Sequence, residues 1–327
     1  MEAKSAHPPL PQFEVGVSAP DLRPWLAGNT GLPGFMSFEA RMPGPHVALL
    51  ALTHGNEIAG AIVLDELLRA GLRPLRGRLS FGFVNTAAFA RFDPRQPTLS
   101  RFIDEDLNRV WDLPVLNGPR RSTELDRARE IRPYLETVDV LLDLHSMLWP
   151  SDPLILCGGT EKGRRLAAGI GVPPLIVADY GHASGRRIID FGRFADPDTT
   201  ASAVLVEGGQ HWQPATVETV RVTVAALLRH LKLAAVPEAP ALPPQGSRQP
   251  PRYALVTDVV TATTAGFAFV QPFRGGDIVP KRNTLIALDG TTEVRTPHDD
   301  CLLVMPSLRP SRGHTAVRLA RVDAPPR

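Results

Sequence analysis

The sequence has little of what marks several protein classes. Its 327 residues hold two cysteines, Cys157 and Cys301, which are too few for a disulfide framework and lack zinc-finger spacing. No apolar run approaches the roughly 18 residues of a membrane-spanning helix, and the N-terminus lacks the apolar segment of a signal peptide. We therefore expect a cytoplasmic protein with no membrane segment.

Charge of one sign is not concentrated anywhere in the chain. The 36 basic and 34 acidic residues give a net charge of +2, and no block of like charge suggests a nucleic-acid partner. Lysine is scarce, so nearly all basic residues are arginine. Arginine suits bidentate recognition of carboxylates, but arginine and proline richness is also typical of genomic composition bias.

The composition is that of a folded protein, with 43% hydrophobic residues and enough length for one large and one small domain. Between residues 46 and 234, short apolar runs alternate with amphipathic segments. This alternation predicts an α/β fold with a mostly parallel or mixed sheet covered by helices. The predicted strands are 46–52, 79–84, 138–144, 154–156, 175–178 and 203–206, and the predicted helices are 58–70, 124–137 (interrupted by Pro133) and 217–233.

Changes in amino-acid composition along the chain predict its domain limits. Residues 1–235 form the predicted α/β catalytic domain, in which 1–44 are a lead-in with one or two edge strands. Residues 236–251 are dense in proline and predict an extended linker. Residues 252–327 are rich in Val and Thr with frequent turn residues, which predicts a small all-β domain.

Polar side chains follow three of the predicted strands. His54 and Glu57 come after strand 46–52, His145 after 138–144, and Glu207 after 203–206. In open α/β sheets, sites form outside the carboxyl ends of the strands. The sequence therefore brings two His and two Glu to one edge of one sheet.

The first of these groups has the spacing of a metal site. His54 and Glu57 lie three residues apart across a turn that contains Gly55, and His145 completes a His₂Glu set. That set is a known catalytic zinc pattern with an open position for water, whose pKa zinc lowers towards neutrality. Glu207 is the candidate general base. The same ligand types also suit Co, Mn or Ni.

Each of these signals has a plainer explanation. A lone His-x-x-Glu occurs by chance in many chains, and a lone His at a strand end is more often structural. Asp143 alternates with His145 on its strand, so it either orients that histidine or is merely solvated. A carboxylate in an apolar run is costly to bury, which favours a partner or a chemical role for Glu207.

A second polar cluster spans residues 101–109, RFIDEDLNR. One interpretation is a surface ion-pair patch. The other is a substrate grip, in which Arg101, Asn108 and Arg109 bind a carboxylate and stabilise an oxyanion. The residues alone leave both interpretations open.

Four motifs occur in an order that resembles the succinylglutamate desuccinylase/aspartoacylase family. They are HGNE (54–57), RFIDEDLNR (101–109), DLHS (143–146) and VEGG (206–209). The resemblance spans roughly residues 46–212, and the β-rich tail also resembles the C-terminal domain of that family. It implies a zinc-carboxypeptidase-like fold and the hydrolysis of the amide bond of small N-acylated amino acids.

The resemblance also implies a role for each matching position. Family members hold one zinc ion per chain and often form dimers, so a homo-oligomer is compatible with it. The implied roles are zinc ligand for His54, Glu57 and His145, general base for Glu207, polarisation of the scissile carbonyl for Arg101, binding of the substrate carboxylate for Asn108 and Arg109, and orientation of a ligand or arginine for Asp106.

Some features depart from the family pattern and leave alternative functions open. Arg186, Arg187 and Arg193 are the candidates for a second substrate carboxylate, and His298 stands where a tyrosine is more usual. A metallocarboxypeptidase would need an extended groove for peptides. A non-catalytic relative that binds a small ligand usually loses a metal ligand or the base. The acyl group and the amine are not readable from the sequence.

Overall fold

The structure is a computed structural model, and it describes residues 11–181, 184–234 and 250–323. These residues form two compact units, the larger comprising 15–147, 153–181, 184–234 and 250–253 and the smaller 11–14, 148–152 and 254–323. The predicted linker at 236–251 lies outside the described residues apart from Pro250 and Pro251. The domain limits predicted from sequence remain a proposal.

The larger unit is built on a mixed sheet with the strand order β1-β3-β2-β4-β7-β5-β6. The central strands β3, β2, β4 and β7 run parallel, whereas β1 pairs antiparallel with β3 and β5 pairs antiparallel with β7 and parallel with β6. Every residue of β2 is buried, as expected for an apolar strand between two parallel neighbours. The strands are β1 (Phe35–Glu39), β2 (His46–Ala51), β3 (Arg78–Phe83), β4 (Val140–Met147), β5 (Leu154–Leu156), β6 (Leu175–Ala178) and β7 (Ser202–Gln210).

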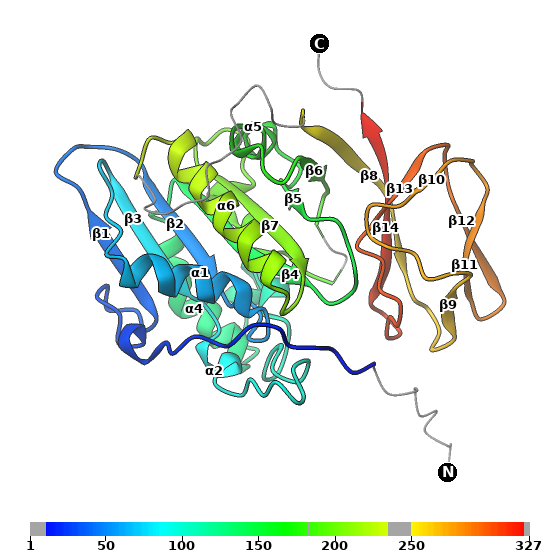
Figure 1. Cartoon of the computed structure of the whole chain (residues 1–327), viewed down its shortest axis with the longest axis horizontal. Coiled ribbons are helices and arrows are strands. Elements are labelled where there is room, and N and C mark those ends of the chain that lie inside the picture. The colour runs from blue at the N-terminus through cyan, green and yellow to red at the C-terminus, as the bar shows by residue number, and fades with distance from the viewer. Residues whose placement is uncertain (1–10, 182–183, 235–249, 324–327) are drawn as a thin grey trace. The chain divides into compact units, whose positions relative to one another are not determined.

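Helices cover both faces of this sheet. Helices α1 and α6 lie on one face (Figure 1), where Gly60 of α1 packs against Leu144 and Gly208 of β7 packs against α6. On the other face, Tyr134 of α4 contacts Ser80 of β3 at 2.7 Å between their hydroxyl oxygens. The helices are α1 (Ile58–Arg69), α2 (Thr86–Phe89), α3 (Leu113–Leu116), α4 (Thr123–Leu135), α5 (Glu161–Ile170) and α6 (Pro214–His230).

The predicted fold class is confirmed, but two local predictions were wrong. Helix α4 contains Pro133 without an interruption, because the proline falls in the last turn and the helix ends two residues later. Strands β4 and β7 are longer than predicted, so His145 and Glu207 lie within their carboxyl-terminal parts instead of after them. Helix α5, capped by Thr160 and ended by Gly171 at a φ of 66°, was not predicted.

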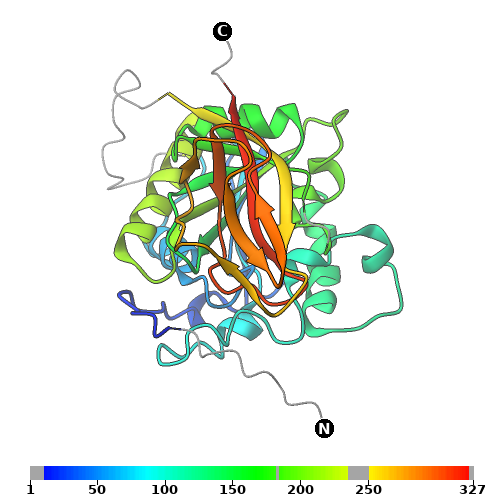
Figure 2. The ribbon, with the colours of Figure 1, turned by 90° about the vertical axis from the view of Figure 1, so that its right-hand side faces the viewer.

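The smaller unit is β-rich, as the turn pattern predicts (Figure 2). One antiparallel sheet joins β10, β13 and β14, and a second has the order β12-β11-β9. Buried residues of both sheets, among them Ile286, Leu303 and Val317, form its core. The strands are β8 (Arg252–Thr261), β9 (Phe267–Phe269), β10 (Ile278–Val279), β11 (Leu285–Asp289), β12 (Thr292–Arg295), β13 (Cys301–Val304) and β14 (Thr315–Asp323).

A membrane-spanning segment was not expected from the sequence. Among the residues that the structure describes, no helix combines the length and the apolar character needed to cross a bilayer.

Candidate metal centre

The three predicted metal ligands converge at the carboxyl end of the sheet. His54 Nδ1 lies 2.7 Å from Glu57 Oε1, and His145 Nδ1 lies 3.0 Å from Glu57 Oε2. One ligand atom from each residue can be chosen so that all three lie within 4.8 Å of one another. All three side chains are almost fully buried, so the group is shielded from bulk water.

Each histidine of this group is backed by a carboxylate on its far nitrogen. His145 Nε2 lies 2.8 Å from Asp143 Oδ2, and Asp143 also accepts a hydrogen bond from the Thr53 hydroxyl. His54 Nε2 lies 2.9 Å from Asp106 Oδ1. A carboxylate at Nε2 favours a proton there and leaves the Nδ1 lone pair facing the centre, which is how metal-binding histidines are commonly oriented. This holds for His145, whereas His54 Nε2 also lies 2.9 Å from Arg101 Nη2.

Neighbouring strands place the ligands together. In the parallel pair of β4 and β7, His145 is the register partner of Glu207, so the two side chains point to the same face of the sheet. His54 and Glu57 enter from the turn after β2, the neighbour of β4 on its other side. Two strands and one turn thus define the site.

The turn that carries His54 and Glu57 is packed too tightly for any side chain at Gly55. A Cβ there would lie 2.5 Å from backbone atoms of Ala88, Phe89 and Ser100. The Gly55 N–H also donates to the carbonyl oxygen of Arg101 at 3.0 Å. The ligand turn and the segment that leads into Arg101 are therefore in direct backbone contact.

The charges of this cluster hold its acids ionised. Burial by itself raises the pKa of Glu57, but the nearby His54 and His145 outweigh it and bring that pKa well below its ordinary value. Burial lowers the pKa of His145, yet Asp143 and Glu57 raise it well above the usual range. The pKa of Asp106 is likewise lowered, because His54 and Arg101 outweigh the effect of burial.

This donor set fits zinc. Two imidazoles and one carboxylate match a catalytic zinc site with three protein ligands, and both imidazoles have the carboxylate partners that such ligands need. Two Nδ1 lone pairs and a carboxylate that face one another repel unless a cation or a proton lies between them. The chemistry of the side chains therefore calls for a positive charge at this point.

Glu207 lies beside the three candidate ligands. It is partly buried on β7 and is followed by Gly208 and Gly209. Its negative charge helps to raise the pKa of Arg101, which places the two groups within electrostatic reach. Glu207 is thus the strand neighbour of His145, and its charge acts on Arg101.

Arg101 contacts the cluster directly. Its Nη1 donates to Glu57 Oε1 at 2.9 Å, and its Nη2 lies 2.9 Å from His54 Nε2 and 3.3 Å from Asp106 Oδ2. Asp106 therefore touches both a candidate ligand, His54, and this arginine. A substrate carbonyl oxygen that accepts a hydrogen bond from Arg101 would have to replace one of these contacts.

Asn108 and Arg109 lie further along the same loop. Asn108 is buried, and its Oδ1 accepts a hydrogen bond from the Ile188 N–H at 2.9 Å. Arg109 Nη1 donates to the carbonyl oxygen of Asn108 at 2.7 Å. In these contacts both side chains form hydrogen bonds to backbone groups. Their role in binding a substrate carboxylate stays a prediction.

Sequence reasoning missed one residue close to the centre. His211 is buried, its Nδ1 lies 2.7 Å from Ser146 Oγ, and the Ser146 N–H donates to Glu57 Oε2 at 3.0 Å. Burial lowers the pKa of His211 to about 4 despite the opposing charge of Glu57. No motif includes this histidine, and its position four residues beyond Glu207 was the only signal for it.

The arginines considered for a second substrate carboxylate are already paired with carboxylates of the chain. Arg187 has a side chain only 1% exposed, so it is closed to any ligand. The pairs are Arg186 with Asp112 at 2.9 Å, Arg187 with Asp179 at 2.6 Å and Asp190 at 2.7 Å, and Arg193 with Asp139 at 3.4 Å.

His298 serves the interior of the smaller unit. Its ring is buried, with Nε2 3.1 Å from Thr257 Oγ1 and Nδ1 2.8 Å from the carbonyl oxygen of Asp299. Both ring nitrogens are therefore used by that unit.

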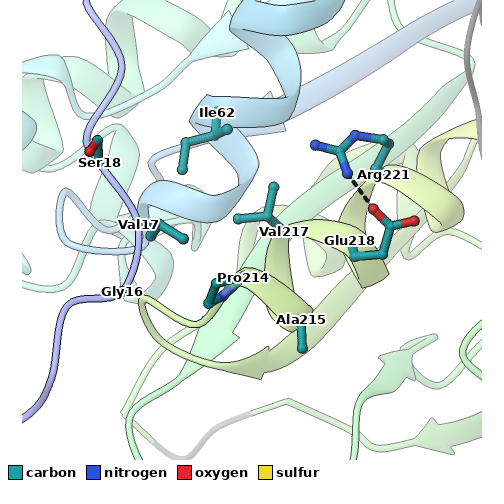
Figure 3. A pocket seen from close by; sticks show the side chains of 9 residues that line it. All are labelled: Gly16, Val17, Ser18, Ile62, Pro214, Ala215, Val217, Glu218 and Arg221. Atoms are coloured by element: carbon teal, nitrogen blue, oxygen red, sulfur yellow. Dashed lines mark hydrogen bonds and ion pairs between the residues drawn. The ribbon is translucent and has the colours of Figure 1, made fainter.

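A surface hollow of about 680 Å³ lies elsewhere on the larger unit (Figure 3). It runs between residues 16–18 and helices α1 and α6, and its floor is apolar at Val17, Ile62 and Val217. The ion pair of Glu218 and Arg221 borders it. None of the predicted site residues line this hollow, so it is separate from the metal centre.

Known proteins resemble the chain in sequence and in fold. The family model for the succinylglutamate desuccinylase/aspartoacylase catalytic domain matches residues 43–234. Mouse aspartoacylase is 32% identical over 117 residues, which is 33% of this chain and 36% of that protein. The Xenopus tropicalis aspartoacylase is 30% identical over 113 residues, 32% of this chain and 34% of that protein. The matched segment thus spans about a third of these curated relatives.

Solved structures share the fold at low identity. Succinylglutamate desuccinylase from Vibrio cholerae superposes with a TM-score of 0.65 at 15% identity, covering 89% of this chain and 86% of that one. The product-bound ectoine utilization protein EutE from Ruegeria pomeroyi gives a TM-score of 0.58 at 17% identity, covering 88% and 87%. The family model covers more than half of the sequence, and the matched residues include His54, Glu57 and His145. The chain therefore belongs to the succinylglutamate desuccinylase/aspartoacylase family.

Proposed function

We propose that this protein is a zinc-dependent amidohydrolase that splits the amide bond of a small N-acylated amino acid. The observation that carries the proposal is the convergence of His54, Glu57 and His145, with Asp106 and Asp143 behind the two histidines. Membership of a family named for desuccinylase and aspartoacylase activity supports the reaction class.

In this proposal His54 and His145 would hold zinc through their ring nitrogens, and Glu57 would hold it through its carboxylate. A zinc ion there supplies a Lewis acid that makes a water nucleophilic near neutral pH and polarises the scissile carbonyl. Asp106 and Asp143 keep the histidine protons on Nε2, as their distances of 2.9 and 2.8 Å allow.

Glu207 is the proposed general base. It takes a proton from the attacking water while the water oxygen bonds to the carbonyl carbon, and it returns that proton to the nitrogen as the carbon–nitrogen bond breaks. Its place opposite His145 in the register of β4 and β7 supports this role.

Arg101 is the proposed partner of the carbonyl oxygen. Its guanidinium donates to the oxygen as negative charge develops there, so the contact strengthens towards the transition state. Its position between Glu57 and Asp106 supports this role, because both acids hold it at the edge of the cluster. Asn108 and Arg109 are the proposed contacts for the substrate carboxylate.

The decisive experiment measures amine release from a panel of N-acyl amino acids. The panel holds N-acetyl and N-succinyl forms of Asp, Glu, diaminobutyrate and ornithine, together with a peptide for the carboxypeptidase alternative. We expect one N-acyl amino acid to be hydrolysed, the activity to vanish with a chelator, and zinc to restore it. His145→Ala should hold no zinc and show no turnover, whereas Glu218→Gln, at the separate hollow, should match the wild type.

Two outcomes would contradict the proposal. Hydrolysis of the peptide alone would favour a metallocarboxypeptidase. A protein that binds zinc but hydrolyses no member of the panel would favour a small-ligand-binding role.

A further inference from the structure

Glu124 is a buried carboxylate that none of the roles above uses. It lies in the first turn of α4, and none of its surface is exposed. It is far in sequence from each candidate zinc ligand, and the family motifs quoted above do not include it. A buried acid of this kind is costly unless hydrogen bonds satisfy it.

Four hydrogen bonds satisfy the carboxylate of Glu124. Its Oε1 accepts the backbone N–H of Ile103 at 2.7 Å and the side-chain amide of Asn85 at 3.1 Å. Its Oε2 accepts the backbone N–H groups of Asp104 at 3.0 Å and Glu105 at 3.2 Å. One side chain thus binds three consecutive amides of the loop.

The loop returns these contacts to the start of α4. Asp104 Oδ2 accepts from the backbone N–H of Thr123 at 2.7 Å and from its hydroxyl at 2.6 Å. The Ser122 hydroxyl donates to Glu105. The loop donates to the helix terminus, and the helix terminus donates to the loop. We call this set of bonds between residues 103–105 and 122–124 the clasp, and Glu124 is its buried member.

The clasped segment lies between two contacts with the metal centre. On one side, Arg101 reaches Glu57 with its side chain and bonds Gly55 through its carbonyl oxygen. On the other side, Asp106 reaches His54 Nε2. Because Arg101 and Asp106 flank the three bound amides, a shift of these amides changes the placement of both side chains.

We propose that Glu124 is a positioning residue that sets the loop carrying Arg101 and Asp106 against the metal centre. It touches neither substrate nor metal and acts through the three amides. Its consequence for the reaction rests on the proposed function, whereas its hold on the loop does not.

The test compares three variants by hydrogen exchange, zinc content and kinetics. Glu124→Gln keeps the shape but replaces one of the two acceptor oxygens with an NH₂ donor, and Glu124→Asp keeps the charge but shortens the reach. Glu130→Gln is the matched control, since Glu130 is an exposed acid of the same helix that contacts Arg127 and not the loop.

We expect Glu124→Gln to speed exchange of at least one of the 103–105 amides by about tenfold or more, because one of the two acceptor oxygens is lost. The core amides of β2 and β4 should keep their protection. With a substrate in hand, kcat should fall about tenfold or more while zinc content stays full, since a misplaced Arg101 weakens transition-state contacts. Glu124→Asp should lie between the wild type and Glu124→Gln, and Glu130→Gln should match the wild type.

Unchanged exchange at 103–105 in folded Glu124→Gln would overturn the proposal. So would equal loss of protection in the loop and in β2 and β4, because that pattern marks a general loss of stability. If Glu124→Gln does not fold, the same two outcomes are judged on Glu124→Asp. Exchange and zinc content need no substrate, so failure of the proposed function leaves this test intact.

Discussion

Two buried charged clusters of the larger unit differ in how they are satisfied. In the first, Arg187 lies between Asp179 and Asp190, and its three guanidinium nitrogens donate to both acids at 2.6 to 3.1 Å. Burial lowers the pKa of Arg187, but the two acids outweigh it and raise that pKa further above its ordinary value. Each donor of Arg187 faces a carboxylate oxygen, so the arginine cluster needs no ligand to satisfy its charges.

In the candidate metal centre, each histidine lies between two carboxylates instead. Asp106 and Asp143 meet the far nitrogens of His54 and His145, but the inner nitrogens of both rings face the carboxylate of Glu57. If the protons are on the far nitrogens, the inner nitrogens need a cation or a proton between them and Glu57. The comparison shows that buried charge alone does not mark a functional site, because the Arg187 cluster needs no ligand to complete it.

Loss of the proposed base should give the largest effect. Glu207→Gln should lower kcat by about 10²–10⁴, because general-base catalysis contributes that much, and zinc content should stay full. Turnover and metal content measured on the same sample check this. Wild-type turnover in Glu207→Gln would remove the base from the mechanism, and loss of zinc would make Glu207 part of the metal site.

Removing Arg187 from its cluster should lower the free energy of unfolding and leave zinc content unchanged. Arg187→Met leaves the buried Asp179 without its cation, which should cost about 3–5 kcal/mol of unfolding free energy. Urea unfolding measures this, with the exposed neighbour Arg186→Met as the control. Loss of zinc with wild-type stability would contradict the structural role assigned to the cluster.

Weakening one outer contact of the metal centre should have a smaller effect. Asp143→Asn should lower zinc affinity by about 10–100-fold, because the His145 ring loses the carboxylate that orients it. Competition with a chelator of known affinity measures this change. An unchanged affinity would show that Asp143 does not tune the site.

A third buried group, His46, should give the smallest effect, seen only in the pH dependence of stability. Its ring nitrogens lie 3.0 Å from the Thr137 carbonyl and 2.8 Å from Ser80 Oγ, and burial lowers its pKa from the ordinary 6.5. The unfolded chain then binds the proton more tightly. The contribution of neutral His46 is thus complete above pH 6.5 and is lost as pH falls through the lowered pKa.

Urea unfolding of the wild type and His46→Gln across this pH range checks the sign. The glutamine variant should lose part of the slope and retain the part that comes from other buried histidines such as His211, whose pKa is also lowered. Equal slopes in both proteins would show that His46 titrates as in the unfolded chain.

The sequence predicts what depends on local pattern. Strand β2, helix α1 and the placement of His54 and Glu57 between them follow from apolar periodicity and a glycine turn, and the structure has them within a residue or so. His145 enters the same group because strand ends of a parallel sheet meet, although its strand runs past it.

Contacts between distant segments could not be predicted in this way. Glu124 meets amides about 20 positions earlier in the chain, and His211 meets Ser146 across 65 positions. The burial of Arg187 depends on the fold around Asp179, so its sequence position suggested a substrate contact that the structure closes off. Local pattern carries no information on such pairings, because packing of the whole unit decides them.

Gly55 has no functional group, yet its position tolerates no side chain. Even the single methyl group of alanine would push the backbones of Ala88, Phe89 and Ser100 away from the ligand turn. A mutational scan scored on activity would therefore rank Gly55 beside His54 and Glu57. In such a scan, essential positions will include residues whose only contribution is the room they leave for their neighbours.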